Sequence, residues 1–217
     1  TISGTAHAAP RRERPKAAQN AGLSLEEVAV MLSSSNADEL RMALEGAAGL
    51  GSADVIPLLD ERIRAGLPPE LLDTAIDAVT LIGDPVAGDL LAGLARHRRP
   101  GVRLKAVQAL VSLRAPQAGK VLSEALSDGA PPVREAAATG LGDLGEKSAV
   151  DRLFLAFDRN VASAARSLGK LVAPDQLGKL LAYVGRVPLN NLTPTFDARL
   201  TRRDLAEAPK LKVVATL

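Results

Sequence analysis

Apolar residues recur along the chain with the spacing of an α-helix and with a longer period of 31 residues. Leu40, Leu71, Val102 and Val133 mark four copies, and small or apolar residues follow each of them at offsets of four, seven and ten or eleven. These offsets lie on one face of a helix. The pattern therefore predicts four equivalent helices, and a fifth, shorter copy begins at Val161.

A second set of helices is expected between these copies. Each candidate begins near a Ser, Asp or Pro, as helix starts commonly do. The candidates are Ala53–Arg64, Pro85–Ala95, Gln117–Leu126, Ala149–Phe157 and Gln176–Val184. Two helices in about 31 residues, stacked in register, form a solenoid.

Two segments resemble the second helix of HEAT-like repeats. They read PGVRLKAVQALVSL over residues 100–113 and PPVREAAATGLGDLG over residues 131–145, and they are similar in style to the short bacterial type first described in phycobilisome lyases. The resemblance covers about residues 24–184. It implies an all-α fold, a right-handed α-solenoid of stacked antiparallel helix pairs, whose second helices line a concave face. It implies no particular chemistry.

The start of the chain differs from the array. Residues 1–22 are rich in Arg and Pro and lack apolar periodicity, so we expect a disordered basic tail. Ala6-His7-Ala8 resembles a signal-peptidase site. If it is one, the protein is periplasmic or secreted, and otherwise it is cytoplasmic. Residues 23–187 are expected to hold about five helix pairs.

The end of the chain, residues 188–217, is expected to combine an irregular insertion with a partial further repeat. The insertion is Pro188–Thr195, and the segment KLKVVATL at 210–217 aligns with RLKAVQAL at 103–110. Half a repeat would leave an apolar stripe unburied. We therefore expect the natural protein to continue beyond Leu217, or another element to cover this end.

Composition restricts the chemistry. Hydrophobic residues make up 47% of the chain, but aromatic residues make up only 2%, and there is no cysteine. Disulfides, thiolate metal sites and cysteine nucleophiles are thereby excluded. No apolar run reaches the ~18 residues that a membrane span requires.

One glycine motif invites a nucleotide-binding interpretation. Gly140-x-Gly142-x-x-Gly145 matches a dinucleotide-binding loop, but such a loop follows a strand and opens a helix. Here the glycines close a predicted helix, and Gly51 and Gly83 stand at matching places. We interpret them as helix-end and packing residues.

The titratable residues suggest no catalytic or metal site. His7 and His97 have no second ligand at a useful spacing, and the arginines beside His97 would lower its basicity. Asp73 and Asp77 form an i,i+4 pair, which is typical of a solvated helix face. We predict no catalytic residue, no metal ligand and no cofactor, and expect the protein not to be an enzyme.

Charge is distributed unevenly along the chain. The net charge is +3 over residues 1–23, −10 over 24–89, +7 over 90–123 and +2 over 124–217, which together give the formal +2. Such separation can steer a charged partner, or neighbouring repeats can attract each other's surface charges. Screening limits longer-range effects to ~8 Å at physiological salt.

Two sets of basic residues are singled out. The first set is predicted to bind a partner and comprises Arg96, Arg98, Arg99, Arg103 and Lys105. The second set recurs with the repeat and comprises Arg41, Arg103 and Arg134. This periodicity favours a structural role, in which the guanidinium pairs with acidic loop residues or with carbonyls at the end of the preceding helix.

Three functions remain open from the sequence. The first is a non-catalytic scaffold that binds another protein on the concave face. The second is weak binding of nucleic acid or another polyanion through the basic third repeat, although aromatic residues for base stacking are scarce. The third is a HEAT-fold enzyme such as a bilin lyase or a DNA glycosylase, which rests on the fold alone.

Overall fold

A computed structural model describes residues 22–184 and 186–201. These residues form twelve α-helices joined by short turns, with no β-strand among them. The helices are α1 Leu25–Leu32, α2 Ala37–Leu50, α3 Ile56–Ala65, α4 Pro69–Ile82, α5 Gly88–Leu94, α6 Pro100–Ser112, α7 Ala118–Ala125, α8 Pro131–Leu144, α9 Val150–Asp158, α10 Ser163–Leu171, α11 Leu177–Leu181 and α12 Leu189–Leu200. One turn of 3₁₀-helix precedes each of α3, α5, α9 and α11, at η2 Ala53–Val55, η3 Pro85–Ala87, η4 Lys147–Ala149 and η5 Pro174–Gln176.

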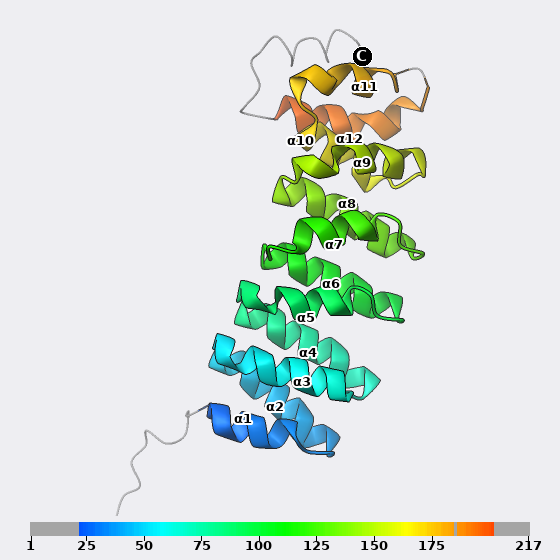
Figure 1. Ribbon diagram of the computed structural model, residues 1–217. Coiled ribbons are helices and arrows are strands. Elements are labelled where there is room, and N and C mark those ends of the chain that lie inside the picture. Colours follow the sequence, from blue (N-terminus) through cyan, green and yellow to red (C-terminus); the bar gives the residue numbers. More distant parts are fainter. Residues whose placement is uncertain (1–21, 185, 202–217) are drawn as a thin grey trace, which may run out of the picture.

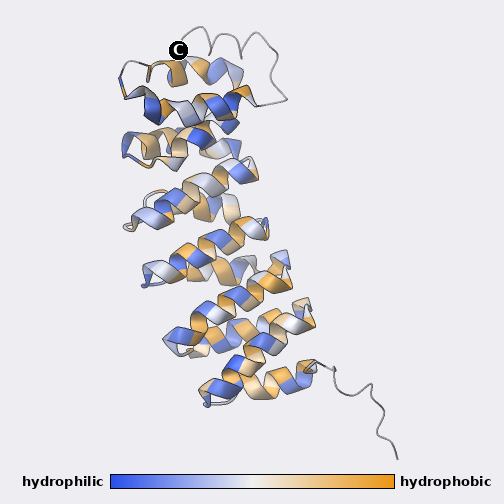
Figure 2. Ribbon diagram, turned by 180° about the vertical axis from the view of Figure 1, so that it is seen from behind, coloured by the Kyte–Doolittle hydropathy of each residue, from blue (hydrophilic) through white to orange (hydrophobic). Residues whose placement is uncertain are grey.

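The helices stack as pairs in a column (Figure 1). The even-numbered helices pack against one another in succession from α2 to α12, and α1 packs on α3 and α5 on α7. The molecule thus has a layer of odd-numbered helices and a layer of even-numbered helices. Seen from behind, blue and orange residues alternate along the helices, as expected of amphipathic segments (Figure 2). The predicted all-α solenoid is confirmed.

Proline and glycine set the ends of the even-numbered helices. Pro69, Pro100 and Pro131 occupy the first position of α4, α6 and α8, where the missing N–H costs nothing. Gly83 and Gly145 end α4 and α8 with a φ of 76°, a left-handed conformation that favours glycine. The glycine motif at 140–145 therefore closes a helix, as predicted from its position.

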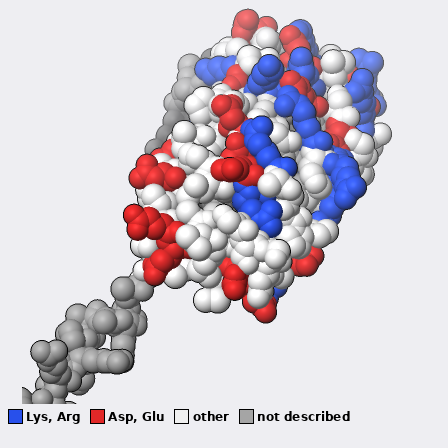
Figure 3. Space-filling model, turned by 60° about the horizontal axis from the view of Figure 1, so that its bottom comes forward, with Lys and Arg blue, Asp and Glu red and all other residues white. Residues whose placement is uncertain are grey.

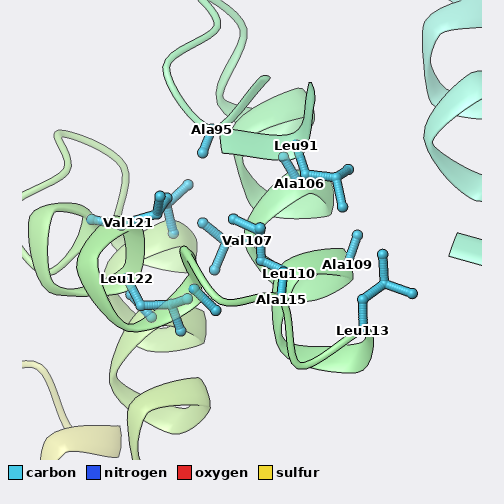
Figure 4. Close-up of a cluster of buried hydrophobic side chains, with 14 of the residues drawn as sticks. Leu91, Ala95, Ala106, Val107, Ala109, Leu110, Leu113, Ala115, Val121 and Leu122 are labelled. Carbon is cyan, nitrogen blue, oxygen red and sulfur yellow. The ribbon is translucent and has the colours of Figure 1, made fainter. Parts of the chain in front are cut away.

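The core lies between the two layers and is built of Leu, Val and Ala. Figure 4 shows one section of it, in which Leu91 from α5, Leu110 from α6 and Leu122 from α7 lie around the same cluster. All three side chains are fully buried. Small side chains such as Ala106 let the helices approach closely, which explains why so few aromatic residues are needed.

Three of the four aromatic residues attach the short helix α11 to α9. Tyr183, just after α11, stacks on Phe154 with ring centroids 5.9 Å apart and meets the edge of Phe157 at 5.3 Å. Its hydroxyl donates to Asp158 at 2.7 Å. Burial, followed by this hydrogen bond, raises the pKa of Tyr183 to about 12. A helix of five residues has little stability of its own, so these contacts hold it in place.

The expected irregular insertion at Pro188–Thr195 is wrong. These residues begin helix α12, which packs on α10 as the next even-numbered helix. Leu192 and Phe196, one turn apart, are buried and provide the apolar stripe. Pro194 inside the helix suggested a break, but packing of this stripe outweighs the cost of the lost hydrogen bond.

Some predictions lie outside the described residues. They are the basic tail with Ala6-His7-Ala8, and the partial repeat at residues 210–217. Within residues 22–184 and 186–201, no helix has the length and apolarity to cross a membrane.

Candidate interaction surface

Arg103 holds the turn between α5 and α6 to the next repeat. Its Nε and Nη2 donate to the two carboxylate oxygens of Asp128, each at 2.7 Å, and its Nη1 donates to the carbonyl of His97 at 2.9 Å. Both side chains of the ion pair are largely buried. The hydrogen bond from Arg103 lowers the pKa of Asp128, and the same bond raises the pKa of Arg103. Arg103 is therefore committed to the fold.

Arg134 repeats half of this arrangement one repeat later. Its Nη1 donates to the carbonyls of Asp128 and Gly129, at 2.8 and 3.2 Å. These are carbonyls in the turn before α8, just as Arg103 contacts the turn before α6. The two arginines make the structural contacts that their spacing suggested.

Arg41 does not belong to this set, and the alignment that placed it there is wrong by one residue. α2 begins at Ala37, 32 residues before Pro69, whereas α4, α6 and α8 begin 31 residues apart. Arg41 is therefore one position further into its helix than Arg103 and points in a different direction. It is exposed, and it makes no hydrogen bond or ion pair with the described residues. Asn36 instead caps α2 by accepting from the N–H of Asp38.

The residues predicted to bind a partner do not form one free cluster. Arg96 pairs with Glu124 of the next repeat at 2.8 Å. Lys105 pairs with Asp77 of the previous repeat at 2.9 Å. Arg99 donates to the carbonyl of Pro69 at 2.9 Å. The side chain of Arg98 is exposed and makes no hydrogen bond or ion pair with a described residue, while its carbonyl accepts from Nη1 of Arg103 at 3.2 Å. A role of these side chains in binding stays a prediction.

His97 lies in the turn between α5 and α6. Its Nδ1 accepts the backbone N–H of Arg99 at 3.2 Å. Burial lowers its pKa first, and the neighbouring charges of Arg98, Arg99 and Arg103 lower it further. The neutral imidazole thus stabilises the turn as a hydrogen-bond acceptor. Among the described residues, no group of three or more His, Asp or Glu side chains could hold a metal ion.

Polar contacts join successive repeats along the array. Lys105–Asp77 and Lys170–Asp143 link even-numbered helices, and Arg96–Glu124 and Lys179–Asp151 link the odd-numbered side. In the view of Figure 3, acidic and basic atoms lie side by side over the middle of the surface. Three cations of the basic band, residues 90–123, therefore pair with carboxylates of neighbouring repeats, and one of those carboxylates, Asp77, belongs to the acidic segment 24–89.

The outer face of the even-numbered helices follows one pattern. If i is the second residue of α2, α4, α6 or α8, then positions i, i+3, i+4, i+7 and i+11 of that helix are partly or fully exposed. They are Asp38, Arg41, Met42, Glu45 and Gly49 on α2; Glu70, Asp73, Thr74, Asp77 and Leu81 on α4; Gly101, Leu104, Lys105, Gln108 and Ser112 on α6; and Pro132, Glu135, Ala136, Thr139 and Asp143 on α8. We call this the even face.

The charges that α6 and α8 present on the even face are paired. Besides the two lysine pairs, Glu135 accepts the backbone N–H groups of Ala162 and Ser163 at the start of α10, at 3.0 and 2.7 Å. The first repeats differ. Glu45, Glu70 and Asp73 make no ion pair with a described cation. One carboxylate oxygen of Asp73 is shielded from solvent and has no hydrogen-bond partner among the described residues.

Large apolar side chains are exposed on both layers. Met42 is 54% exposed and Leu81 is 73% exposed on the even face, while Val30 of α1 and Leu155 of α9 are 72% and 57% exposed on the odd side. A groove of about 560 Å³ lies beside Met42 on α2 and is also lined by Glu45, Gly46 and Gly49.

A second, smaller groove of the even face lies between α8, α10 and α12. It measures about 400 Å³, and Thr139, Arg166 and Lys170 are among the residues that line it. On the odd side, a groove of about 310 Å³ lies between α7 and α9, where Leu155 is flanked by Arg152 and Arg159. The α2 residues Met42, Glu45, Gly46 and Gly49 of the first groove were not singled out from the sequence, because their common orientation follows only once the start of α2 is known.

Comparison with known proteins agrees with this architecture. A model of HEAT repeats matches residues 89–169, which run from the start of α5 into α10. Residues 89–169 are therefore similar to HEAT repeats, and the rest of the described array has the same helical-pair architecture. No curated protein sequence matches it.

Two solved structures share the fold of this chain. An engineered protein is 16% identical, with a TM-score of 0.53, over 88% of this chain and 94% of that one. The complex of CpcE and CpcF of phycocyanin lyase from Nostoc sp. PCC7120 is 20% identical, with a TM-score of 0.52, over 95% of this chain and 98% of that one. Identities this low establish the fold alone.

Proposed function

We propose that this protein is a non-catalytic scaffold that binds another protein across its even face. The observation that carries the proposal is a set of even-face side chains that the array itself does not use. Met42 and Leu81 are exposed rather than packed, and Glu45 and Asp73 have no cationic partner among the described residues. Folding gains nothing from such residues, whereas exposed apolar side chains beside polar ones are typical of binding surfaces.

The fold supports the same proposal. HEAT repeats form extended surfaces that are typical of protein-interaction scaffolds. Successive even-numbered helices pack directly on one another, so the even face is continuous from α2 to α12. The resemblance described from the sequence places the second helices, which are the even-numbered ones, on the concave side of the array.

The alternative of polyanion binding receives less support. Three residues of the basic band, Arg96, Arg103 and Lys105, are engaged by carboxylates of neighbouring repeats. An anion would have to displace those carboxylates. The remaining cations of the band are scattered over a turn and the odd-numbered side. Weak binding that requires low salt is the most that this arrangement favours.

The likeness to a lyase complex gives no reason to assign a reaction, because fold does not determine chemistry. We propose no catalytic step for this chain. Expression together with a bilin should yield colourless protein, and incubation with alkylated DNA should release no base. A covalently coloured product or a released base would contradict the non-catalytic proposal.

Site-specific photo-crosslinking tests the proposed face. A photoreactive amino acid is placed at Gln108 or Thr139 on the even face, and as matched controls at Gly93 on α5 or Lys120 on α7. All four positions are exposed. In an extract of the source cells, we expect one saturable protein adduct from the even-face positions and none from the controls. Adducts from the control positions alone, or none from any position, would contradict the proposal.

A further inference from the structure

The two ends of the even face differ in how far their charges are satisfied. On α6 and α8 every charged outward residue is paired or caps a helix: Lys105 with Asp77, Glu135 with the start of α10, and Asp143 with Lys170. On α2 and α4, Glu45, Glu70 and Asp73 lack such partners. From α2 to α8 the unsatisfied charge of this face is therefore mainly negative and lies in the first repeats, where Arg41 is the one unpaired cation.

Asp73 gives the sharpest sign that a cation is missing. One of its carboxylate oxygens is shielded from solvent without a hydrogen bond to any described residue. A shielded acceptor without a donor is costly, and the charge of a cation bound beside the carboxylate would offset that cost without reaching the shielded oxygen. Arg41, the cation of the same face, makes no ion pair with this carboxylate.

Apolar contact area lies beside Glu45. The groove of about 560 Å³ lies between α2 and the residues Gly22 and Leu23 that precede α1, and Met42, Glu45 and glycines 46 and 49 lie along it. Among the described residues, a Cβ added at Gly49 would meet nothing within 4 Å, so the absence of a side chain there keeps the groove open without serving the packing of the array. Leu81 supplies a second exposed apolar side chain on α4.

We infer that the surface formed by Met42, Glu45, Glu70, Asp73 and Leu81, the α2–α4 surface, binds a protein segment in which Lys or Arg side chains alternate with large apolar ones. This inference rests on the proposed function and specifies the partner's chemistry. The cations of the segment pair with the three carboxylates, and an apolar side chain enters the groove beside Met42. Acidic segments and nucleic acids carry the wrong charge.

Other occupants fit the surface less well. Residues 10–16 of this chain, PRRERPK, are basic but offer no large apolar side chain for the groove. A second copy of the chain would have to present the basic band, whose Arg96, Arg103 and Lys105 are already engaged. Both occupants are distinguished by the experiment below.

Peptide binding to the full chain tests the inference. The probe is a fluorescent helical peptide of ~18 residues with Leu on one stripe and Lys beside it. Two matched probes replace every Lys by Glu, or every Leu by Ser. We expect the Lys/Leu peptide to bind at ~0.15 M ionic strength and both matched peptides to bind at least ~10-fold more weakly.

Three variants of the chain locate the binding. Glu45→Lys/Asp73→Lys reverses the charge of the α2–α4 surface, and Gly49→Leu fills the groove. The control Glu26→Lys/Glu61→Lys makes the same charge change on α1 and α3 of the odd side, at exposed positions. We expect the first two variants to weaken Lys/Leu binding at least ~10-fold, while the control stays within ~2-fold and all melting temperatures remain close to that of the parent.

Several outcomes would overturn the inference. Equal weakening of binding by Glu45→Lys/Asp73→Lys and by Glu26→Lys/Glu61→Lys would mean unspecific electrostatic attraction. Equal binding of the Glu/Leu peptide would show that binding does not need cations on the peptide. Tighter peptide binding after Arg12→Glu/Arg14→Glu would make the chain's own basic residues the occupant, and a concentration-dependent dimer abolished by Glu45→Lys/Asp73→Lys would make it a second copy. Photo-crosslinking at Gln108 or Thr139 can still trap a partner when the Lys/Leu peptide does not bind the α2–α4 surface. In that case the scaffold proposal stands and only this inference is lost.

Discussion

At the scale of single residues, the ion pair of Arg103 and Asp128 does more than its exposed counterparts. Both side chains are largely buried, and the carboxylate also accepts the backbone N–H of Ala130 at 2.8 Å. The pair thus ties the turn before α6 to the turn before α8. Arg96–Glu124 has a similar length of 2.8 Å but is exposed on both sides. The two pairs should therefore contribute very different amounts to stability.

The first prediction compares these pairs. Asp128→Ala should lower the free energy of unfolding by about 2 kcal/mol, because it leaves Nε and Nη2 of Arg103 and the amide of Ala130 without an acceptor. Glu124→Ala should change it by less than about 0.5 kcal/mol, since exposed ion pairs are worth little. Urea denaturation measures both. Equal effects of the two substitutions would show that the buried pair has no special role.

The second prediction concerns pH. The hydrogen bond from Arg103 lowers the pKa of Asp128 in the folded chain, so the unfolded chain takes up this proton first. The stabilisation is fully present above the pKa of an aspartate in the unfolded chain, about 4. It is lost as the pH falls through the lower pKa of Asp128 in the folded chain. The difference in unfolding free energy between parent and Asp128→Ala should therefore shrink between pH 6 and pH ~3. If this difference in unfolding free energy does not change with pH, Asp128 stabilises the chain by packing and not by its charge.

At the scale of helices, glycine marks where two helices touch backbone to backbone. A Cβ at Gly169 of α10 would clash with the carbonyl oxygen of Thr195 in α12. Because that atom belongs to the backbone, the whole helix would have to move. Gly93 on α5 is the opposite case, since an added Cβ meets nothing within 4 Å.

The third prediction uses this contrast. Gly169→Ala should destabilise the chain by about 1–3 kcal/mol through displacement of α12, despite the better helix propensity of Ala. Gly93→Ala should instead stabilise it by about 0.5–1 kcal/mol, because only propensity changes. Thermal unfolding of both variants gives the comparison. Stabilisation by Gly169→Ala would mean that α12 does not pack on α10 as described.

Most helices were predictable from the sequence, and the exceptions have physical causes. The period of apolar residues and the Pro and Gly at helix ends predicted α4, α6 and α8, because local preference and packing agree there. Leu40 was aligned one residue out of register, because apolar spacing alone does not reveal that Asn36 caps α2. α12 was missed because Pro194 opposes helix formation locally, and only packing on α10 overrides it.

At the scale of the whole molecule, the charge distribution along the sequence proved to have two parts. Lys105 and Asp77 are 28 residues apart in sequence and pair between adjacent even-numbered helices, so this part of the separation serves stacking. Which carboxylates stay unpaired depends on the three-dimensional neighbours of each, and the sequence does not reveal these. The exposure of Met42 and Leu81 could not be predicted for the same reason, because Met and Leu are residue types that usually lie in a core.

The central claim is that the even face, and not the odd side, contacts the partner. Hydroxyl-radical footprinting of the array, alone and with the protein captured by crosslinking, tests it directly, because both layers carry exposed side chains that react. Met42 and Leu81 report on the even face, and Val30 and Leu155 report on the odd side. The account predicts that the partner reduces oxidation of Met42 and Leu81 and leaves Val30 and Leu155 unchanged. Protection of Val30 and Leu155 with Met42 and Leu81 still reactive would contradict it.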